Sequence, residues 1–429
     1  MKSWWGKGRK ETGWRFISRG KRNTRQTCTK ILGVLLVVSV ASVPLLYAGR
    51  GEPYTSGVPT SSPQSASPGP PSYSHPGNGS FPSFKKIWEG KFIEDQGPFQ
   101  FIYTIDPILQ GAAEEVFRVL RPPFGVFVAV EAKTGKILAL ADYARESSEY
   151  GEFWKRATYP AASVFKLITA ASALEKGMLN FDSAVSFRGN QYLLGPSKIN
   201  KTYRGEKQTQ FDDALGKSNN VVFGRVASKL VGSQVLRQYS EAFGFNRPIQ
   251  FDFPLDMSKA IIPDETYELA RCGAGFGKVT LNPLHGAMIA ACIANDGLMM
   301  RPFLIETIRS PEGELLYQAR AEGLAQPITP RTAQGLNRMM RRTVEDGTAS
   351  KSFRRYGKNL LKNMSVGGKT GSLSGDDPPG LYDWFVGFVP ADDPQIAFSA
   401  MVVTYQSLKI RGAFVAQEAL KRFFRDRPN

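Results

Sequence analysis

Histidine and cysteine are scarce in this chain: its 429 residues include two histidines and three cysteines. Neither His75 nor His285 has a partner at ligand spacing, so we expect no metal centre and no cofactor. The same scarcity argues against a hydrolase that combines serine, histidine and aspartate. The cysteines fit no disulfide framework. Cys272 and Cys292 are expected to be small core residues, and a disulfide between them stays open.

Acidic residues are outnumbered by basic ones. Aspartate and glutamate total 38 residues against 55 lysines and arginines, which gives a formal net charge of +17 at pH 7. Residues 1–30 contain ten of the basic residues and one acid, Glu11. Because about half of the excess lies in this tail, directly before an apolar run, we assign it to membrane topology and expect no nucleic-acid partner. The remaining excess favours attraction of anionic lipid or polymer substrates.

The apolar run covers residues 31–48 and carries no charge. As a helix, at roughly 1.5 Å per residue, it would span about 27 Å, which nearly matches the hydrocarbon core of a bilayer. The basic flank predicts a single-pass transmembrane helix with its N-terminus in the cytoplasm and the rest of the chain outside. A cleaved signal peptide is the competing interpretation, but the long basic region and the lack of a clear cleavage site favour an uncleaved anchor.

Composition divides the chain into four parts. Residues 1–30 form the basic cytoplasmic tail and residues 31–48 the transmembrane helix. Residues 49–83 are rich in proline, serine and glycine, which is typical of a flexible tether. Residues 84–429 are the globular part, and the chemistry is expected there.

Hydrophobic periodicity indicates an α+β fold for the globular part. A helix is expected after Asp106, and a β-hairpin follows, with strands at residues 125–130 and 136–142. Residues 181–300 read as mainly helical, and strands return late, followed by a last helix. The late strands are expected at residues 365–372, 383–389 and 396–404, and the helix at 413–425. The sequence therefore predicts an antiparallel sheet flanked by helices and built from both ends of the chain, with an inserted all-helical subdomain and the site in the cleft between them.

A serine and a lysine occur three residues apart in a predicted buried helix. Pro160 suits the first turn of this helix and Gly177 the left-handed position after its end. On one helix face, the amine of Lys166 would reach the hydroxyl of Ser163 and take its proton, provided that burial or a nearby cation keeps Lys166 neutral. The pattern alone is weak, because the same spacing occurs at residues 18–21 and 83–86.

Two further runs have ordinary structural interpretations when each is taken alone. Ser218-Asn219-Asn220 is typical of a capped helix start. Lys369-Thr370-Gly371-Ser372 ends a predicted strand and is also compatible with a turn, as the identical tripeptide at residues 133–135 indicates. The order of all three motifs along the chain is more informative than any one of them.

In this order the three motifs resemble those of the transpeptidase domain of penicillin-binding proteins, a family related to the active-site serine β-lactamases. The resemblance covers residues 101–425. Supporting stretches that agree in order lie at residues 130–139, 273–277, 294–297, 347–349 and 384–390. The resemblance implies the corresponding α+β fold and places the protein in the bacterial cytoplasmic membrane, with its catalytic domain in the periplasm or otherwise outside.

The resemblance also implies catalytic roles. Ser163 would attack the penultimate D-Ala carbonyl of a peptidoglycan stem peptide, and Lys166 would take the serine proton. Ser218 would relay a proton to the leaving nitrogen, and Asn220 would hold Lys166 and the substrate amide. An amine of a second stem peptide would then accept the acyl group. β-Lactams would acylate Ser163 because they mimic the D-Ala-D-Ala end.

The implied binding residues form the Lys369-Thr370-Gly371-Ser372 run. Lys369 would lower the pKa of Lys166 by like charge and attract the substrate carboxylate, which the hydroxyls of Thr370 and Ser372 would bind. Backbone N–H groups of Ser163 and Ser372 would form the oxyanion hole. The family commonly has threonine where this chain has Ser372, which keeps the hydroxyl.

Several functions share these motifs. We expect a monofunctional transpeptidase, because no glycosyltransferase region precedes the motifs, and a separate glycan polymerase is an expected partner. A D,D-carboxypeptidase stays open, because sequence does not decide whether water or an amine attacks the acyl-enzyme. A β-lactamase would need a base for water, and residues 241–246 are the nearest run to such a motif and lack its pattern. A non-catalytic β-lactam sensor or a scaffold for division proteins is disfavoured by the intact motif residues.

Overall fold

The computed structural model describes residues 82, 84–146, 151–355, 358–359, 361, 364–405 and 410–426. The basic tail, the transmembrane helix and the tether, apart from Pro82, lie outside these residues, as do Cys28 and His75. Within the described ranges, no helix combines the length and the apolar character needed to cross a bilayer. The boundaries drawn from composition therefore stay predictions.

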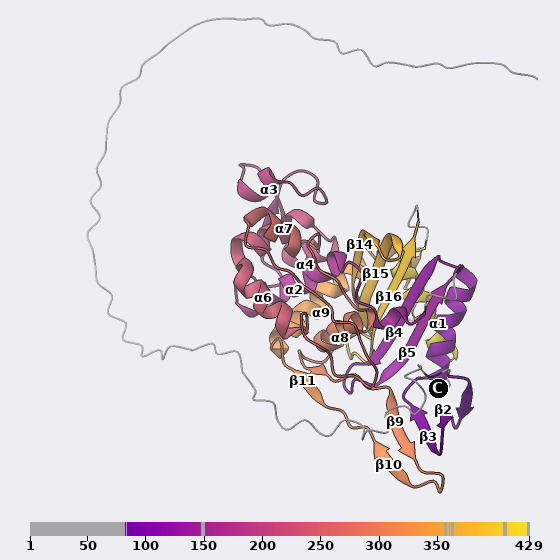
Figure 1. Ribbon diagram of the computed structural model, residues 1–429. Coiled ribbons are helices and arrows are strands. Elements are labelled where there is room, and N and C mark those ends of the chain that lie inside the picture. The colour runs from indigo at the N-terminus through magenta and orange to yellow at the C-terminus, as the bar shows by residue number, and fades with distance from the viewer. Residues whose placement is uncertain are drawn as a thin grey trace, which may run out of the picture. The chain divides into compact units, whose positions relative to one another are not determined.

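A five-stranded antiparallel sheet forms the centre of the fold (Figure 1). Its strand order is β14-β15-β16-β4-β5, so strands from both ends of the described chain share one sheet, as the sequence predicts. The bounds are β4 Phe124–Glu131, β5 Ile137–Ala144, β14 Gly367–Asp376, β15 Pro379–Val389 and β16 Ile396–Thr404. Strand β14 lies at one edge, which leaves one of its sides free to meet the residues around Ser163.

Both faces of the central sheet are covered. Side chains alternate along each strand, so Phe398 and Val402 of β16 pack in one hydrophobic cluster and Met401 and Val403 in the other. Helices α1 (Pro107–Leu120) and α11 (Gly412–Asp426) cover the first face. The helical part of the chain covers the second face, and α8 (Pro283–Ala294) packs directly on its strands. Burial on both sides explains the nearly continuous apolar sequence of these strands.

The helical part between β5 and β14 holds most of the remaining helices. They are η1 (Phe153–Lys155), η2 (Ala162–Phe165), α2 (Lys166–Glu175), α3 (Pro196–Asn200), α4 (Phe211–Gly216), α5 (Asn220–Arg225), the π-helix η3 (Val226–Val231), α6 (Gly232–Ala242), α7 (Thr266–Gly273), α9 (Pro330–Glu345) and α10 (Ser350–Phe353). The expected all-helical subdomain also contains a small antiparallel hairpin, formed by β6 (Ala184–Phe187) and β7 (Lys207–Gln210). The sequence missed this hairpin because each strand has four residues and little apolar alternation.

A second five-stranded sheet, of order β1-β2-β3-β9-β10, was also absent from the prediction. Its strands are β1 Lys86–Trp88, β2 Lys91–Gln96, β3 Phe99–Tyr103, β9 Ile305–Arg309 and β10 Leu315–Gln318. In Figure 1, β2 and β3 lie beside β9 and β10 although some 200 residues separate them in sequence. Short pairs complete the described strands: β8 (Met299–Met300) with β11 (Gly323–Ala325), and β12 (Arg354–Arg355) with β13 (Lys358–Asn359).

The helix that carries Lys166 begins later than its sequence predicts. Pro160 forms a bridge with Thr280 and accepts a hydrogen bond on its carbonyl from Trp384 Nε1 at 3.0 Å, so tertiary pairing keeps it out of the helix. Ala162 then takes a positive φ of 48°, and Ser163 follows in a short 3₁₀ turn. The helix end matches the prediction, because Gly177 has φ 65°. Ser163 is therefore presented by a constrained turn, directly before a buried helix.

Candidate active site

The Lys166 amine lies among three oxygen atoms. Its Nζ is 2.6 Å from Ser163 Oγ, 2.8 Å from Asn220 Oδ1 and 2.6 Å from the carbonyl oxygen of Ala274. The amide and carbonyl oxygens can only accept hydrogen bonds, and a neutral amine has two N–H donors and one lone pair. When the two donors serve these oxygens, the lone pair is left for the hydroxyl of Ser163. The arrangement suits removal of the serine proton.

The orientation of Asn220 is set by its other side-chain contact. Its Nδ2 donates to the carbonyl oxygen of Tyr192 at 2.8 Å, which turns Oδ1 toward Lys166. Asn220 opens α5, and the preceding residue, Asn219, caps that helix by accepting a hydrogen bond from Val222 N. The sequence predicts this capped start. The structure adds that the residue after the cap faces the lysine.

Burial sets the protonation of both motif lysines. Lys166 is completely buried, and loss of solvation, assisted by the charge of Lys369, holds the pKa of Lys166 well below its ordinary value. Burial also lowers the pKa of Lys369, to about 7. The sequence named burial and a nearby cation as the two possible causes for Lys166. Both act on its pKa, and desolvation is the larger effect.

Ser218 and Lys369 join the helical part to the central sheet. Ser218 has φ 54° and occupies the turn between α4 and α5. Lys369, from β14, donates to Ser218 Oγ at 3.0 Å and to the carbonyl oxygen of Thr370 at 2.7 Å. Because Ser218 accepts this bond, its own O–H stays available for a further acceptor.

The edge strand β14 approaches Ser163 at Gly371. A Cβ atom placed on Gly371 would lie 3.2 Å from the backbone nitrogens of Ser163 and Val164, so the absence of a side chain permits this approach. Thr370 Oγ1 lies 2.5 Å from Thr348 Oγ1, a contact that pattern reasoning did not assign. The three motifs thus meet at one place, with Ser163 between the strand and the helices.

Asp383 is a further member of the site that the sequence prediction missed. It lies opposite Ser372 in the strand register, is 1% exposed, and accepts hydrogen bonds from Ser372 Oγ at 2.7 Å and from Gly412 N at 2.8 Å. Arg411 Nε approaches the same carboxylate at 3.3 Å. Burial raises the pKa of Asp383, while Arg411 opposes that rise. An aspartate within an otherwise apolar strand was the signal available in the sequence.

The other residues singled out in the sequence lie elsewhere. Lys133, which begins the other Lys-Thr-Gly tripeptide, lies in the turn after β4 and forms an ion pair with Asp393. Cys272 and Cys292 are buried free thiols, which answers the open disulfide question. His285 is buried in α8, where Nε2 lies 2.7 Å from the carbonyl oxygen of Phe243. These contacts belong to the fold.

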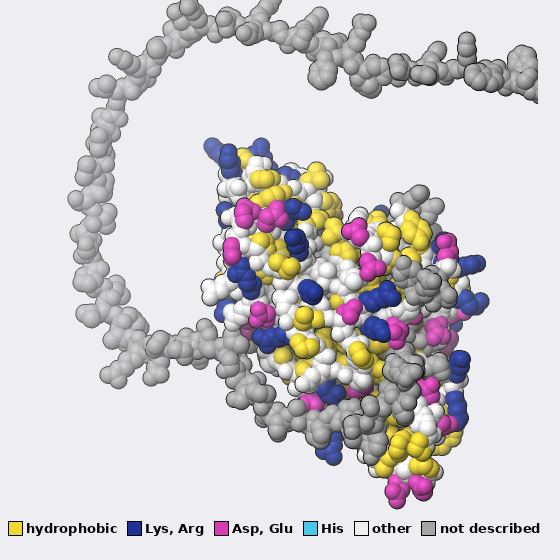
Figure 2. All heavy atoms as spheres, viewed as in Figure 1, with side chains coloured by type: hydrophobic (Ala, Val, Ile, Leu, Met, Phe, Trp, Pro, Cys, Tyr) yellow, Lys and Arg dark blue, Asp and Glu magenta, His cyan; other side chains and the backbone are white. Residues whose placement is uncertain are grey.

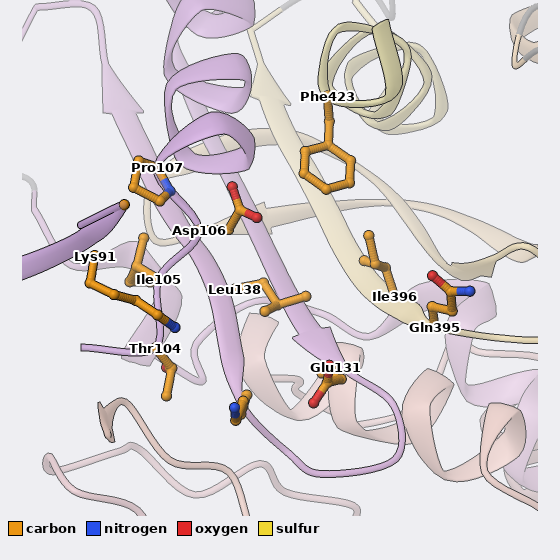
Figure 3. A pocket seen from close by; sticks show the side chains of 12 residues that line it. Lys91, Thr104, Ile105, Asp106, Pro107, Glu131, Leu138, Gln395, Ile396 and Phe423 are labelled. Carbon is orange, nitrogen blue, oxygen red and sulfur yellow. The ribbon is translucent and has the colours of Figure 1, made fainter. Parts of the chain in front are cut away.

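A cavity of about 280 Å³ lies away from the motifs, beside the start of α1 (Figure 3). Its charged lining groups are already engaged. Asp106 caps α1 by accepting from Ile108 N and Leu109 N, and Lys91 and Lys136 both pair with Glu306. Glu131 accepts a hydrogen bond from Thr134 Oγ1, so each charged side chain that lines this cavity already has a partner.

Residues 125–424 match the family model described as the penicillin binding protein transpeptidase domain, and the chain belongs to this family. This range contains all three motifs and the whole central sheet except Phe124. The family assignment rests on the sequence match and is consistent with the fold described above.

Known relatives agree in sequence and in fold. Peptidoglycan D,D-transpeptidase PbpA of Mycolicibacterium smegmatis is 26% identical over 335 residues, which cover 70% of this chain and 66% of PbpA. The D,D-transpeptidase domain of a peptidoglycan glycosyltransferase from Eggerthella lenta has a TM-score of 0.63 at 25% identity and covers 75% of this chain and 82% of that one. A penicillin G acyl-enzyme complex of penicillin-binding protein A from M. tuberculosis has a TM-score of 0.60 at 23% identity, covering 75% and 80%. The chain thus spans just under two thirds of the length of PbpA.

The close approach of Gly275 to the serine turn generates a prediction. Gly275 has φ 95°, and a Cβ there would lie 2.3 Å from the carbonyl oxygen of Ala162 and 2.9 Å from Ser163 N. We expect Gly275→Ala to displace the turn and to slow acylation of Ser163 by a penicillin at least about tenfold, as small misplacements of reacting groups do. Stopped-flow measurement of the acylation rate checks this.

The matched control is Gly232→Ala. Gly232 also has a positive φ, 78°, but open space surrounds the position of its Cβ. This variant should lose about 1–3 kcal/mol of unfolding free energy, because φ 78° with ψ 164° is a conformation that only glycine adopts readily, and it should keep the acylation rate. Equal acylation rates for the two variants and the wild type would contradict the assigned role of Gly275.

Proposed function

We propose that this protein is a peptidoglycan D,D-transpeptidase that cross-links stem peptides through an acyl-enzyme on Ser163. One observation carries the proposal: Ser163 Oγ lies 2.6 Å from a buried lysine amine whose other two partners can only accept hydrogen bonds. The names of relatives agree with it, since PbpA is called a peptidoglycan D,D-transpeptidase and a fold neighbour is described as a penicillin G acyl-enzyme complex.

In the first half-reaction, Ser163 Oγ attacks the carbonyl carbon of the penultimate D-Ala, and Lys166 takes the hydroxyl proton. The bond from serine oxygen to carbon forms, the bond from carbon to the leaving nitrogen breaks, and the proton that Lys166 took passes through Ser218 to that nitrogen. The terminal D-Ala departs as a neutral amine. We assign the oxyanion hole to the backbone N–H groups of Ser163 and Ser372, where β14 approaches the serine turn.

In the second half-reaction, an amine of another stem peptide attacks the acyl carbon. The amine loses a proton to Lys166, which is neutral again after the first half-reaction. The bond from the acyl carbon to Ser163 breaks, and Lys166 returns the proton to the serine oxygen. Lys369 and Thr370 hold the substrate carboxylate before D-Ala leaves. Ser372 Oγ donates to Asp383 Oδ2 at 2.7 Å, so its hydroxyl must turn in order to donate to the substrate.

Hydrolytic alternatives differ in what attacks the acyl-enzyme. A D,D-carboxypeptidase would use water in the second step, and a β-lactamase would do so rapidly with a dedicated base. Within the described part of the chain, the hydrogen-bond partners of Ser163 and Lys166 include no carboxylate. This favours slow hydrolysis and hence transfer to an amine. A non-catalytic β-lactam sensor would not need a neutral lysine poised at the serine.

The proposal extends to the setting of the enzyme. The uncharged run at residues 31–48, preceded by the basic tail, supports a single-pass anchor in the bacterial cytoplasmic membrane with the transpeptidase domain outside. The tether at residues 49–83 would let that domain reach its substrates. We further propose monofunctional activity, with a separate glycan polymerase supplying the strands.

Brief exposure to a penicillin tests the proposed nucleophile. We expect the intact mass of the full-length wild type to increase by one penicillin molecule and to keep that adduct for many minutes, because hydrolysis lacks a dedicated base. Ser163→Ala should remain unmodified at every time. Rapid drug turnover without an adduct would favour a β-lactamase, and an adduct on Ser163→Ala would refute the assignment of the nucleophile.

The coupling of the two lysines predicts a pH effect. Acylation should increase as rising pH deprotonates Lys166 and decrease as Lys369 loses its proton, near its pKa of about 7. Lys369→Met removes a like charge, so the pKa of Lys166 should increase. The rising limb of the rate profile should then move upward by on the order of one pH unit, and the falling limb should disappear.

Penicillin acylation rates between pH 5 and pH 9 provide the measurement. Lys133→Met is the control, since Lys133 starts the same tripeptide in an exposed turn and pairs with Asp393. Its profile should match that of the wild type. An unmoved rising limb in Lys369→Met would show that the charge of Lys369 does not act on Lys166.

A further inference from the structure

A small projection stands at the rim of the site. It consists of β6, α3, β7 and the loops between them, residues 184–210, and α3 lies at the upper end of the molecule in Figure 1. Its base touches the catalytic residues directly. Asn220 N donates to the carbonyl oxygen of Gln191 at 2.9 Å, and Asn220 Nδ2 donates to that of Tyr192 at 2.8 Å. One residue thus separates the projection from Lys166.

The projection carries an excess of positive charge. Residues 184–210 include five lysines and arginines and one acid, Glu206. Four of the basic side chains are exposed, and we call them the basic rim: Arg188, Lys201, Arg204 and Lys207. Figure 2 shows dark blue side chains at this end of the molecule. Within the described part of the chain, no member of the basic rim forms an ion pair.

Glu206, the acidic residue of the projection, is already paired with an arginine. Arg225, from α5, contacts both carboxylate oxygens of Glu206 at 2.7 Å and donates to the carbonyl oxygens of Lys198 and Lys201. The Glu206 side chain is 3% exposed, and its bonds to Arg225 lower the pKa of Glu206 to about 2. Glu206 therefore stays ionised and satisfied by Arg225, so it does not neutralise the basic rim.

The platform beneath the basic rim is held in shape. Arg225 ties three segments of the projection together, and Lys198 Nζ donates to the carbonyl oxygens of Asn190 and Leu193, which closes the loop before α3. Arg188 stacks on Tyr203, with its guanidinium carbon 4.0 Å from the ring centre. The cations are thus presented on a fixed framework rather than on a free loop.

We propose that the basic rim is a docking surface for the peptidoglycan strand, which it recognises through free carboxylates of the stem peptides. The inference rests on the proposed function, because that function places one stem peptide at Ser163 and leaves the rest of an anionic strand outside the site. Uncompensated cations at the rim complement that charge and steer the strand toward the serine. A small β-lactam would reach Ser163 without using this surface.

Two triple variants of the full-length protein test the proposal. The first is Lys201→Gln/Arg204→Gln/Lys207→Gln. The second replaces three exposed basic residues outside the projection, as Arg320→Gln/Arg331→Gln/Lys351→Gln, and so removes the same charge elsewhere. Binding is measured in a Ser163→Ala background, with fluorescent uncross-linked peptidoglycan strands at low and physiological salt. A second set of strands has its stem-peptide carboxylates amidated. Penicillin acylation is measured with Ser163 intact.

We expect the rim triple variant to bind carboxylate-bearing strands roughly tenfold more weakly at low salt, with a smaller salt dependence, and the control variant to bind like the wild type. Amidated strands should bind weakly and equally to all three proteins, and the penicillin acylation rate should not change. If both triple variants lost strand affinity equally, the effect would be one of net charge alone, and the proposal would be overturned. Unchanged strand binding by the rim triple variant would overturn it as well.

Vesicles containing phosphatidylglycerol separate this proposal from membrane attraction. If the rim variant lost vesicle binding but kept strand binding, the basic rim would be a lipid surface and the proposal would be wrong. Failure of the proposed function would be seen separately, as a wild type that penicillin does not acylate. A wild type that is acylated, together with a rim variant that binds strands normally, would overturn only the docking inference.

Discussion

The burial of an uncharged amine beside a serine hydroxyl is the constraint on which this site depends. Among the described residues, the hydrogen-bond partners of the buried Lys166 amine include no carboxylate that could balance an ammonium group, and a second cation, Lys369, opposes its charge. The surroundings of Lys166 therefore favour the neutral form. Two acceptors, Asn220 Oδ1 and the Ala274 carbonyl, then direct its lone pair to Ser163.

Much of the architecture can be understood as support for that contact. The turn that carries Ser163 is held by Trp384 from β15 at Pro160 and by the close approach of Gly275 at Ala162. Lys369 reaches Ser218 across the boundary between sheet and helices. The central sheet is covered on both faces, so β14 presents its motif from a rigid edge. Positive φ values at Ala162 and Ser218 mark the places where the backbone is strained to point side chains into the site.

The sequence predicted the features that depend on local pattern or on motif order. Neighbouring residues indicated the helix cap at Asp106 and the left-handed helix end at Gly177. Apolar runs indicated that the central sheet contains strands from both ends of the globular part. The contact between Ser163 and Lys166 was expected from their spacing in a predicted buried helix, and it forms although Ser163 lies in the 3₁₀ turn before that helix. That Ser218, Asn220 and Lys369 converge with them required the resemblance to a family, because nothing in their spacing fixes a distance.

Features created by long-range pairing were not predictable in this way. The Lys166 helix starts later than predicted because Pro160 pairs with Thr280, which lies more than a hundred residues further along the chain. The sheet that joins β3 to β9 depends on segments that carry weak individual signals. Asp383 could be flagged only as an unusual acid in an apolar strand, and its partner Ser372 became evident from the strand register. The tail, the transmembrane helix and the tether stay predictions from composition.

The most direct test of the account is the titration of Lys166 itself, followed by carbon NMR of the full-length protein labelled at lysine Cε, with Lys166→Met to assign the signal. The account predicts a Lys166 resonance that changes to the chemical shift of a neutral amine at a pH well below the one at which the surface lysines titrate. A Lys166 signal that titrates together with the surface lysines, near their ordinary pKa, would contradict the claim that this lysine is the base for Ser163.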